Sequence, residues 1–287
     1  MTLIVVTPIH NEANNIGILA QQLADSTRQP DLWIVVDDGS TDDGPAIVRG
    51  MNLPMETVVL SRENGGGLIG GSAFTAWQYG VDEAVRRCPE FDHVMKLDAD
   101  VELPAKYLEL VLEEFAGDQC LGLVGGVLVG KRDREQTVHV PGPVKLYSRS
   151  AYEGMSNVPR RVGFDVMDEL AIKSVGLQVR VRKDLHFSVR RAIGASQGLV
   201  HGRRRNGQVC RWTGYWLPYF MLHTIRYVFR RPYVIGSVAM AYGFARAGAG
   251  PYPKELKVAH ALEQRMKLRA AIRSPRRWIH ETYGISE

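Results

Sequence analysis

The stretch LWIVVDDGSTD at residues 32–42 carries the pattern that decides the fold of this 287-residue chain. Its first five residues form a continuous apolar run, which is typical of a strand buried on both faces of a parallel sheet. Polar turn residues follow at once, and they also follow a second apolar run at residues 3–7. Both runs therefore predict buried strands that end in polar loops.

Working outward, the sequence alternates between strand-like and helix-like segments. Further strands are expected at residues 57–60, 93–97, 121–129 and 177–182. Helices are expected at residues 11–24 (capped by Asn11), from the glycine-rich segment 64–71 through Arg87, and at 104–115 and 165–176. This alternation predicts an α/β fold with a doubly wound, mainly parallel sheet, in which ligands bind at the carboxyl ends of the strands.

Composition narrows the class of protein. Hydrophobic residues make up 45% and charged residues 23% of the chain, as in a folded globular protein. The three cysteines are widely spaced and form no CxxC pair, which argues against a disulfide framework or a cysteine zinc site and favours a reducing cytosol. The N-terminal segment shows no basic leader or cleavage site, so we do not expect secretion.

Charge divides the chain into two regions. Residues 199–287 carry a formal net charge of +12, whereas residues 1–198 carry −7. We therefore predict a catalytic domain at 1–198 and a basic, aromatic-rich helical region at 199–287.

The basic region holds two apolar, aromatic stretches of 14 residues, at 212–225 and 232–245, with arginines between them. A helix needs about 20 apolar residues to cross a bilayer, so neither stretch is long enough. The arginine and aromatic borders favour helices that lie on an anionic membrane surface. Two buried helices, or a homodimer interface, are the alternatives. A basic helix is expected at 254–277.

Acidic residues follow the predicted strands. Asp98 and Asp100 come directly after the apolar strand 93–97, where two carboxylates can meet one Mg²⁺ or Mn²⁺ ion together with a diphosphate. Asp37 and Asp38 follow the strand at 32–36 and can accept hydrogen bonds from a ribose or a base. Taken singly, each pair is also compatible with a solvated turn.

Four motifs occur in a fixed order: residues 7–12, 36–42, 64–66 and 96–100. In this arrangement the chain resembles the family 2 glycosyltransferases of the GT-A fold, which are inverting enzymes that use nucleotide-sugars. The resemblance covers about residues 2–190. It implies that Asp98 and Asp100 hold the metal and the diphosphate, and that the following residues surround the nucleoside: Pro8, His10, Glu12, Asp37 and Asp38. Arg62 either faces the nucleotide or is a solvated surface residue.

An inverting transferase needs a general base to take the proton from the acceptor hydroxyl. Asp168 matches the family's base position, but the acid that normally precedes it is replaced by Met167, so Asp165 and Glu169 are rival candidates. These acids could instead only favour the start of a helix through its dipole. His186 lies about where relatives supply a late histidine as a third metal ligand, although a lone histidine is often structural.

Residues 208–212 match the QxxRW pattern of processive polysaccharide synthases, which makes Arg211 and Trp212 candidates for diphosphate binding. Those synthases have long transmembrane helices, which this chain lacks. Residues 214–219, followed by arginine-rich helices, instead resemble the tail of soluble family 2 enzymes that act on lipid-linked glycans, and we favour this second resemblance.

Together these features predict a metal-dependent, inverting glycosyltransferase for a cell-surface polysaccharide or glycolipid, with a UDP-sugar as the default donor. We expect a location in the cytoplasm, on the inner face of the membrane, and no nucleic-acid partner. One alternative is a sugar-nucleotide pyrophosphorylase, although the loop after the first strand is acidic and lacks the glycine and lysine expected there. The other is a non-catalytic scaffold at the membrane surface.

Overall fold

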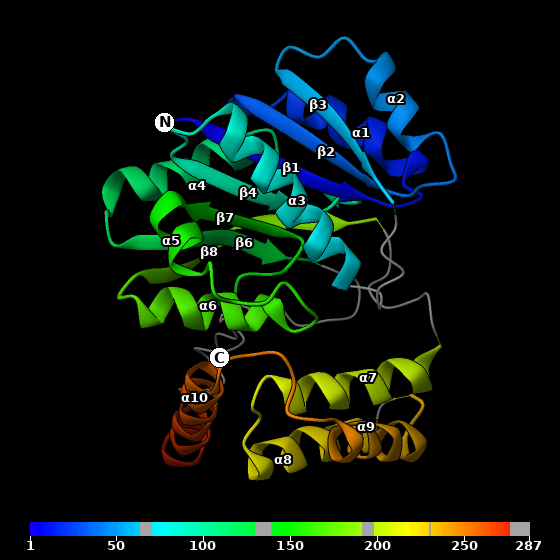
Figure 1. Ribbon diagram of the computed structural model, residues 1–287. Coiled ribbons are helices and arrows are strands. Elements are labelled where there is room, and N and C mark those ends of the chain that lie inside the picture. The colour runs from blue at the N-terminus through cyan, green and yellow to red at the C-terminus, as the bar shows by residue number, and fades with distance from the viewer. Residues whose placement is uncertain (64–70, 130–138, 191–197, 230, 276–287) are drawn as a thin grey trace. The chain divides into compact units, whose positions relative to one another are not determined.

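The computed structural model describes residues 1–63, 71–129, 139–190, 198–229 and 231–275 (Figure 1). The chain divides into two compact units, Met1–Arg161 with Ile172–Arg191, and Val162–Ala171 with Ala192–Glu287. The predicted boundary at residues 198 and 199 lies near the second break. Residues 162–171 were predicted to belong to the catalytic domain, whereas they cluster with the second unit.

The first unit is built on a sheet of eight strands in the order β3-β2-β1-β4-β7-β6-β8-β5. β1, β2, β3 and β4 are parallel, β6 and β8 are parallel, and β7 and β5 each run antiparallel to their neighbours. The structure therefore confirms the predicted, mainly parallel α/β sheet. The sheet is mixed, because the pairings of β7 and β5 are antiparallel. The strands are β1 (Leu3–Ile9), β2 (Leu32–Asp38), β3 (Glu56–Arg62), β4 (His93–Leu97), β5 (Val101–Glu102), β6 (Leu121–Leu128), β7 (Val144–Ser148) and β8 (Gln178–Val189).

Helices cover both faces of this sheet (Figure 1). Alternate residues of β1, including Leu3 and Val5, share a buried cluster with residues of α1 and α4. On the other face α3 packs so tightly that a Cβ on Gly80 would lie 2.5 Å from Val6 Cγ1. The helices of this unit are α1 (Ala13–Ala24), α2 (Gly44–Gly50), α3 (Gly71–Arg87), α4 (Tyr107–Gly117) and α5 (Arg149–Gly154). The next helix along the chain is α6 (Phe164–Ser174), whose residues up to Ala171 belong to the second unit.

The N-terminus of α1 differs from the prediction. Asn11 does not cap this helix: it has a positive φ of 57°, and Glu12 occupies the cap position, where its side chain makes no capping hydrogen bond to the backbone. Asp42 instead accepts hydrogen bonds from Ala13 N at 2.8 Å and Gly44 N at 3.0 Å. One carboxylate thus accepts hydrogen bonds from the first residues of both α1 and α2. Negative charge is favourable at these two N-termini because of the helix dipole.

The second unit contains four further helices, α7 (Leu199–Trp212), α8 (Leu217–Val228), α9 (Val234–Arg246) and α10 (Lys254–Arg273). The predicted stretches at 212–225 and 232–245 correspond to α8 and α9, whereas α7 was not predicted. Of the described helices, none combines the length and the apolar character that crossing a bilayer requires.

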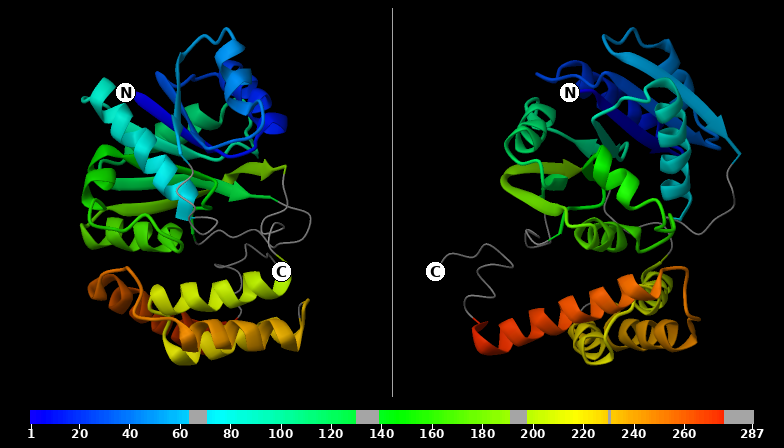
Figure 2. Two further views of the ribbon diagram at one scale, coloured as in Figure 1. Left: turned by 45° about the vertical axis from the view of Figure 1, so that its right-hand side comes forward. Right: turned by 60° about the vertical axis from the view of Figure 1, so that its left-hand side comes forward.

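Glycines bring α7 and α9 into backbone contact, and the two helices lie side by side in both views of Figure 2. A Cβ on Gly207 would lie 1.9 Å from Met240 O, and a Cβ on Gly243 would lie 1.9 Å from Arg204 O. Only glycine allows this approach, so the spacing of the two helices depends on these two positions.

A buried hydrogen-bond network fastens α10 to the turn between α7 and α8. His260 Nδ1 lies 2.7 Å from Thr213 O, and Gln264 Nε2 lies 2.9 Å from His260 Nε2. Gln264 Oε1 accepts a hydrogen bond from Trp216 N at 2.9 Å. Every polar group in this chain of contacts has a partner, as burial requires.

The contact between α7 and α9 can be tested with two alanine substitutions in one helix. We expect Gly207→Ala to lower the free energy of unfolding by about 2 kcal/mol, because the methyl group enters space held by backbone. Apart from its own stretch of helix, no described residue has an atom within 4 Å of the Cβ position of Gly202, so Gly202→Ala should raise stability by up to about 1 kcal/mol through helix propensity. Thermal unfolding followed by circular dichroism measures both, and equal effects would contradict the packing.

His93, at the start of β4, should make stability depend on pH. Burial lowers the pKa of its imidazole from 6.5 to about 4, and its Nδ1 has no hydrogen-bond partner among the described residues. The neutral ring is favoured in the folded state, so its contribution is complete above pH 6.5 and declines as the pH falls toward 4. Between about pH 7.5 and about pH 5, this group should lower the free energy of unfolding by roughly 2 kcal/mol.

The imidazole of His93 packs on the ring of Phe115, with centroids 4.4 Å apart. We expect His93→Leu, which keeps an apolar side chain at this position, to remove this part of the acid sensitivity in urea unfolding. The control His186→Gln alters an exposed histidine, and the stability of this variant should fall with pH as much as that of the parent chain. A leucine variant with unchanged acid sensitivity would show that other groups dominate.

Candidate active site

The carboxyl ends of β1 and β2 lie side by side, because Ile9 pairs with Asp37 in parallel register. Asp37 is buried and its Oδ1 accepts a hydrogen bond from Ser40 N at 2.8 Å, which orders the turn after β2. Gly39 in this turn has a φ of 73°, a conformation that favours glycine. The sequence motif at residues 36–42 is thus a structured loop at the sheet edge.

Asp38 is a buried acid that is paired with an arginine from the neighbouring strand. Asp38 and Arg62 are register partners on β2 and β3, and Arg62 Nε lies 3.0 Å from Asp38 Oδ1. The side chain of Asp38 is 5% exposed and that of Arg62 is 21% exposed. Arg62 is therefore not a solvated surface residue: it compensates the charge of a carboxylate that is removed from water.

The end of β1 contributes polar groups to the same edge. His10 is exposed, and its Nδ1 lies 2.9 Å from Asp38 O. Glu12 Oε2 accepts a hydrogen bond from Asn15 Nδ2 at 2.7 Å. Pro8 and Glu12 are half-buried. The five residues predicted to surround a nucleoside thus lie on two adjacent strand ends.

Asp98 and Asp100 follow β4, which pairs in parallel with β1. Asp98 N donates to Pro143 O at 2.9 Å, so this turn is held against the segment that precedes β7. Both carboxylates are half-buried and accessible in part. Three neighbouring strands of one parallel set therefore carry predicted acidic residues at or just beyond their ends: Asp37 and Asp38 on β2, Glu12 after β1, and Asp98 and Asp100 after β4.

Lys96 is a residue of this site to which sequence reasoning gave no role. It is 3% exposed, and its Nζ donates to Asp98 Oδ1 and to Gly142 O, the latter at 2.8 Å. The spacing i, i+2 at the end of a strand puts both side chains on one face. A lysine inside an otherwise apolar strand, two positions before an acid, was the available signal.

The structure does not bring His186 to the two aspartates. His186 is exposed on β8, four residues before Arg190, whose backbone N donates to Asp100 O at 2.9 Å. At a strand rise of about 3.3 Å per residue, this separates it from that contact by about 13 Å. Among the residues that the structure describes, no group of three His, Cys, Asp or Glu could hold a metal ion.

The candidate bases lie on α6. Asp168 is 0% exposed and Glu169 is 1% exposed, and Asp168 Oδ1 accepts a hydrogen bond from Glu169 N at 2.7 Å. Asp165, in the first turn, is half-buried. Residues 162–171 belong to the second unit, where Tyr252 donates its hydroxyl hydrogen to Val162 O at 3.0 Å. Their roles stay predictions.

Arg211 and Trp212 form the end of α7. The guanidinium of Arg211 lies 5.4 Å from the centre of the Phe244 ring, a stacking contact on α9. Trp212 is half-buried and lies so close to Gly250 that a Cβ there would be 2.4 Å from its indole. Both side chains thus have packing partners within the helical unit, and their role in binding a donor stays a prediction.

A mainly parallel α/β sheet with polar residues at the ends of successive strands defines the class of α/β proteins that bind ligands at this edge of the sheet. Residues 4–172 match the family described as Glycosyl transferase family 2. The match covers more than half of the chain, which therefore belongs to this glycosyltransferase family. No curated protein matches the chain.

Several solved structures share the fold. TarS from S. aureus in complex with UDP-GlcNAc aligns with a TM-score of 0.59 and 15% identity, over 96% of this chain and 92% of that chain. A mannosyltransferase from Pyrobaculum calidifontis in complex with GDP-Man and Mn²⁺ aligns with a TM-score of 0.55 and 20% identity, over 97% and 83%. Identities this low show a common GT-A fold and no more.

The third is glucosyl-3-phosphoglycerate synthase from Mycobacterium tuberculosis in complex with Mn²⁺, UDP and glucosyl-3-phosphoglycerate. It aligns with a TM-score of 0.50 and 20% identity, over 67% of this chain and 72% of that chain. The fold class is thus common to proteins that bind different nucleotide-sugars or nucleotides, so it does not identify the sugar or the acceptor of this chain.

The role of Lys96 can be tested by removing its charge. We expect Lys96→Met to lower the free energy of unfolding by about 2 kcal/mol, because the variant removes the ammonium group that donates to Gly142 O and to Asp98 Oδ1. Lys106 is exposed before α4, so Lys106→Met should change stability by less than about 0.5 kcal/mol. Urea unfolding measures both. A Lys96 variant as stable as the control would mean that the buried ammonium contributes nothing.

Proposed function

We propose that this chain is a metal-dependent, inverting glycosyltransferase that moves a sugar from a nucleotide-sugar to a hydroxyl group of a glycan acceptor. The observation that carries the proposal is the shared edge of β1, β2 and β4. Asp37, Asp38 and Asp98 lie at this edge, with His10 beside the backbone of Asp38. Acidic and imidazole side chains at strand ends suit the hydroxyl and N–H groups of a nucleoside.

The donor set fits a hard divalent cation. Asp98 and Asp100 supply carboxylate oxygens, and Mg²⁺ or Mn²⁺ is often held by one or two carboxylates together with substrate phosphates and water. The absence of a third protein ligand among the described residues is compatible with such a site. When bound, the cation would neutralise charge on the departing diphosphate. The Mn²⁺-containing structures with this fold support the choice of metal.

The transfer itself needs one proton acceptor. In the proposed step the acceptor oxygen forms a bond to the anomeric carbon while the bond from that carbon to the diphosphate oxygen breaks. Asp168 takes the proton of the acceptor hydroxyl, which leaves a neutral carboxylic acid and an inverted sugar. Asp165 and Glu169 are the rival bases on the same helix.

We propose a lipid-linked acceptor and a role in polysaccharide or glycolipid synthesis, with the enzyme on the inner face of the membrane. The support is the basic, acid-poor character of residues 199–287, because basic surfaces favour anionic lipid. A UDP-sugar is the default donor, and a GDP-sugar is the nearest alternative, since structures with this fold carry either nucleotide.

Calorimetric titration with UDP, GDP and dTDP, each with and without Mn²⁺, tests the donor site. We expect one nucleotide to bind, with an affinity at least tenfold higher in the presence of Mn²⁺. Asp98→Asn should abolish this metal dependence, whereas the control Asp25→Asn, at an exposed position, should bind like the parent chain. A folded protein that binds none of the nucleotides would favour the scaffold alternative.

The general base can be identified by three isosteric substitutions. We expect Asp168→Asn to lower the transfer rate by at least about a hundredfold, because general-base catalysis contributes about 10²- to 10⁴-fold. Nucleotide affinity should stay within about twofold, since the change does not alter the donor site. Asp165→Asn and Glu169→Gln, measured alongside, should retain transfer. If one of these two falls instead, that residue is the base.

A further inference from the structure

The outer side of α8 is apolar and exposed. Five large hydrophobic side chains on this helix and just after it are between 50% and 80% exposed: Leu217, Met221, Leu222, Ile225 and Phe229. Isolated exposed hydrophobic residues are ordinary, but a row of them on one side of a helix marks an interaction surface.

The outer side of α9 continues this pattern. Val234, Ile235, Val238 and Tyr242 are between 48% and 65% exposed. α8 and α9 are in contact with each other, and we call the nine exposed side chains of the two helices the apolar face.

The apolar face is not needed for the core of the helical unit. α8 packs on its neighbours through its other side, where Phe220 stacks on Phe244 with ring centroids 3.9 Å apart. Tyr227, on the same side, lies under Arg203 with its ring centroid 3.9 Å from the guanidinium carbon. Ser237 Oγ donates to Thr224 O at 3.0 Å. Among the described residues, α8 thus packs against the bundle through the side opposite the apolar face.

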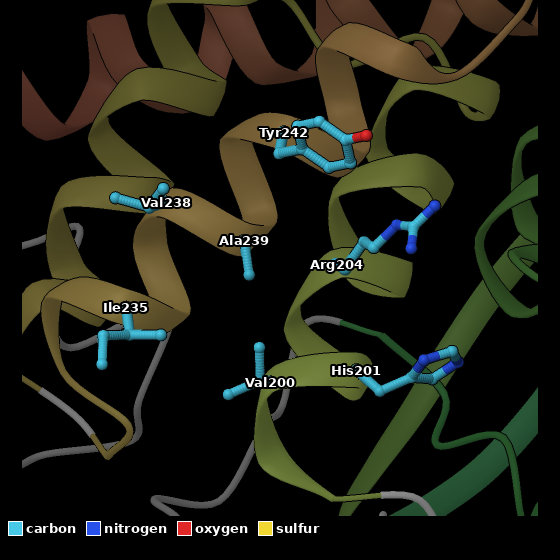
Figure 3. Close-up of a pocket in the computed structure, with 7 residues that line it drawn as sticks. All are labelled: Val200, His201, Arg204, Ile235, Val238, Ala239 and Tyr242. Atoms are coloured by element: carbon cyan, nitrogen blue, oxygen red, sulfur yellow. The ribbon is translucent and has the colours of Figure 1, made fainter.

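A groove of about 520 Å³ between α7 and α9 extends the apolar surface (Figure 3). Val200 of α7 and Ala239 of α9 point into it from opposite sides, and Ile235 and Val238 belong to both the groove and the apolar face. Arg204 and His201 line its other border. The groove therefore joins an apolar surface to the guanidinium of Arg204 and the imidazole of His201.

The segment that carries this surface has charge of one sign. Residues 185–254 contain no Asp or Glu. Arg226 on α8, Arg231 just before α9 and Arg246 at the end of α9 are exposed. A second copy of the chain docked on the same face would bring arginines toward arginines, whereas a surface of anionic lipid would offer phosphate groups to them.

From these observations we infer that the apolar face inserts into the interfacial region of an anionic bilayer, with the neighbouring arginines at the level of the lipid phosphates. Helices of 12 and 13 residues that are apolar on one side are suited to lie in this region and not to cross it. The inference rests on the proposed function only in one respect, namely that a lipid-linked acceptor gives the enzyme a reason to be there.

Flotation with vesicles of phosphatidylcholine, with and without phosphatidylglycerol, tests the inference on the full chain. We expect binding to the anionic vesicles that weakens as salt is added. The triple variant M221Q/I225Q/V238Q replaces three side chains that are 53%, 57% and 62% exposed. It should reduce vesicle affinity at least tenfold and keep the parent circular dichroism spectrum.

The matched control is V258Q/L262Q/M266Q on α10, whose side chains are 50%, 50% and 62% exposed. It should bind vesicles like the parent chain. Equal losses in the two triple variants would overturn the assignment of this face. A parent chain that stays unbound but forms a dimer, which the α8 and α9 variant dissolves, would overturn the bilayer in favour of a second copy.

The charge contribution is tested by R226Q/R231Q/R246Q, which should lose most of the preference for anionic over neutral vesicles. An unchanged preference would overturn the role of the arginines. Nucleotide titration on the same samples separates the two proposals: nucleotide binding without vesicle binding contradicts only the surface, and vesicle binding without nucleotide binding contradicts only the transferase site.

Discussion

The parallel pairing of β1 with β2 on one side and β4 on the other is the constraint on which the rest of the site depends. It brings Asp37, Asp38 and Asp98 to one edge, where their like charges oppose one another. Two cations offset this cost. Arg62 pairs with Asp38 across the β2–β3 register, and Lys96 contacts Asp98 from two positions earlier on β4. The negative charge of this edge is thus partly balanced by Arg62 and Lys96.

The acids at this edge differ in how deeply they are buried and how they are paired, which suits them to different roles. Asp38 is nearly buried and its carboxylate is paired with Arg62, so it is suited to hold the loop and present its backbone to His10. Asp98 and Asp100 remain half-buried and accessible in part. Carboxylates that can still be reached from solvent are the ones that can coordinate a cation, and the cation can in turn bind a diphosphate. The proposed metal site is therefore assigned to these two acids.

In the helical unit the equivalent constraint is steric. Gly207 and Gly243 allow the backbones of α7 and α9 to touch, and stacked arginines such as Arg203 over Tyr227 fill the space around the crossing. This packing uses one side of α8 and α9 and leaves the opposite sides apolar and exposed. The exposed face therefore follows from the packing of the helices, which buries only one side of α8 and α9.

Local sequence alone determined the strand cores and most helices, because continuous apolar runs and periodic apolar positions depend on near neighbours. The strand at residues 93–97 was predicted with the bounds that it has, and the basic helix at 254–277 begins where α10 begins. The acids at 37, 38, 98 and 100 were also readable, since strand ends in a parallel sheet share an edge. Tertiary structure decided the rest.

The role of Arg62 required the β2–β3 register, and the separation of His186 from Asp100 required the register of β8 with β5. β7 was missed because Lys145 interrupts its apolar run, yet this lysine is fully buried. Asp42, and not Asn11, accepts the hydrogen bond of the first backbone N–H of α1, so the acceptor comes from a loop distant in sequence. Pairings between distant segments are set by packing and charge compensation in three dimensions, which no local pattern encodes.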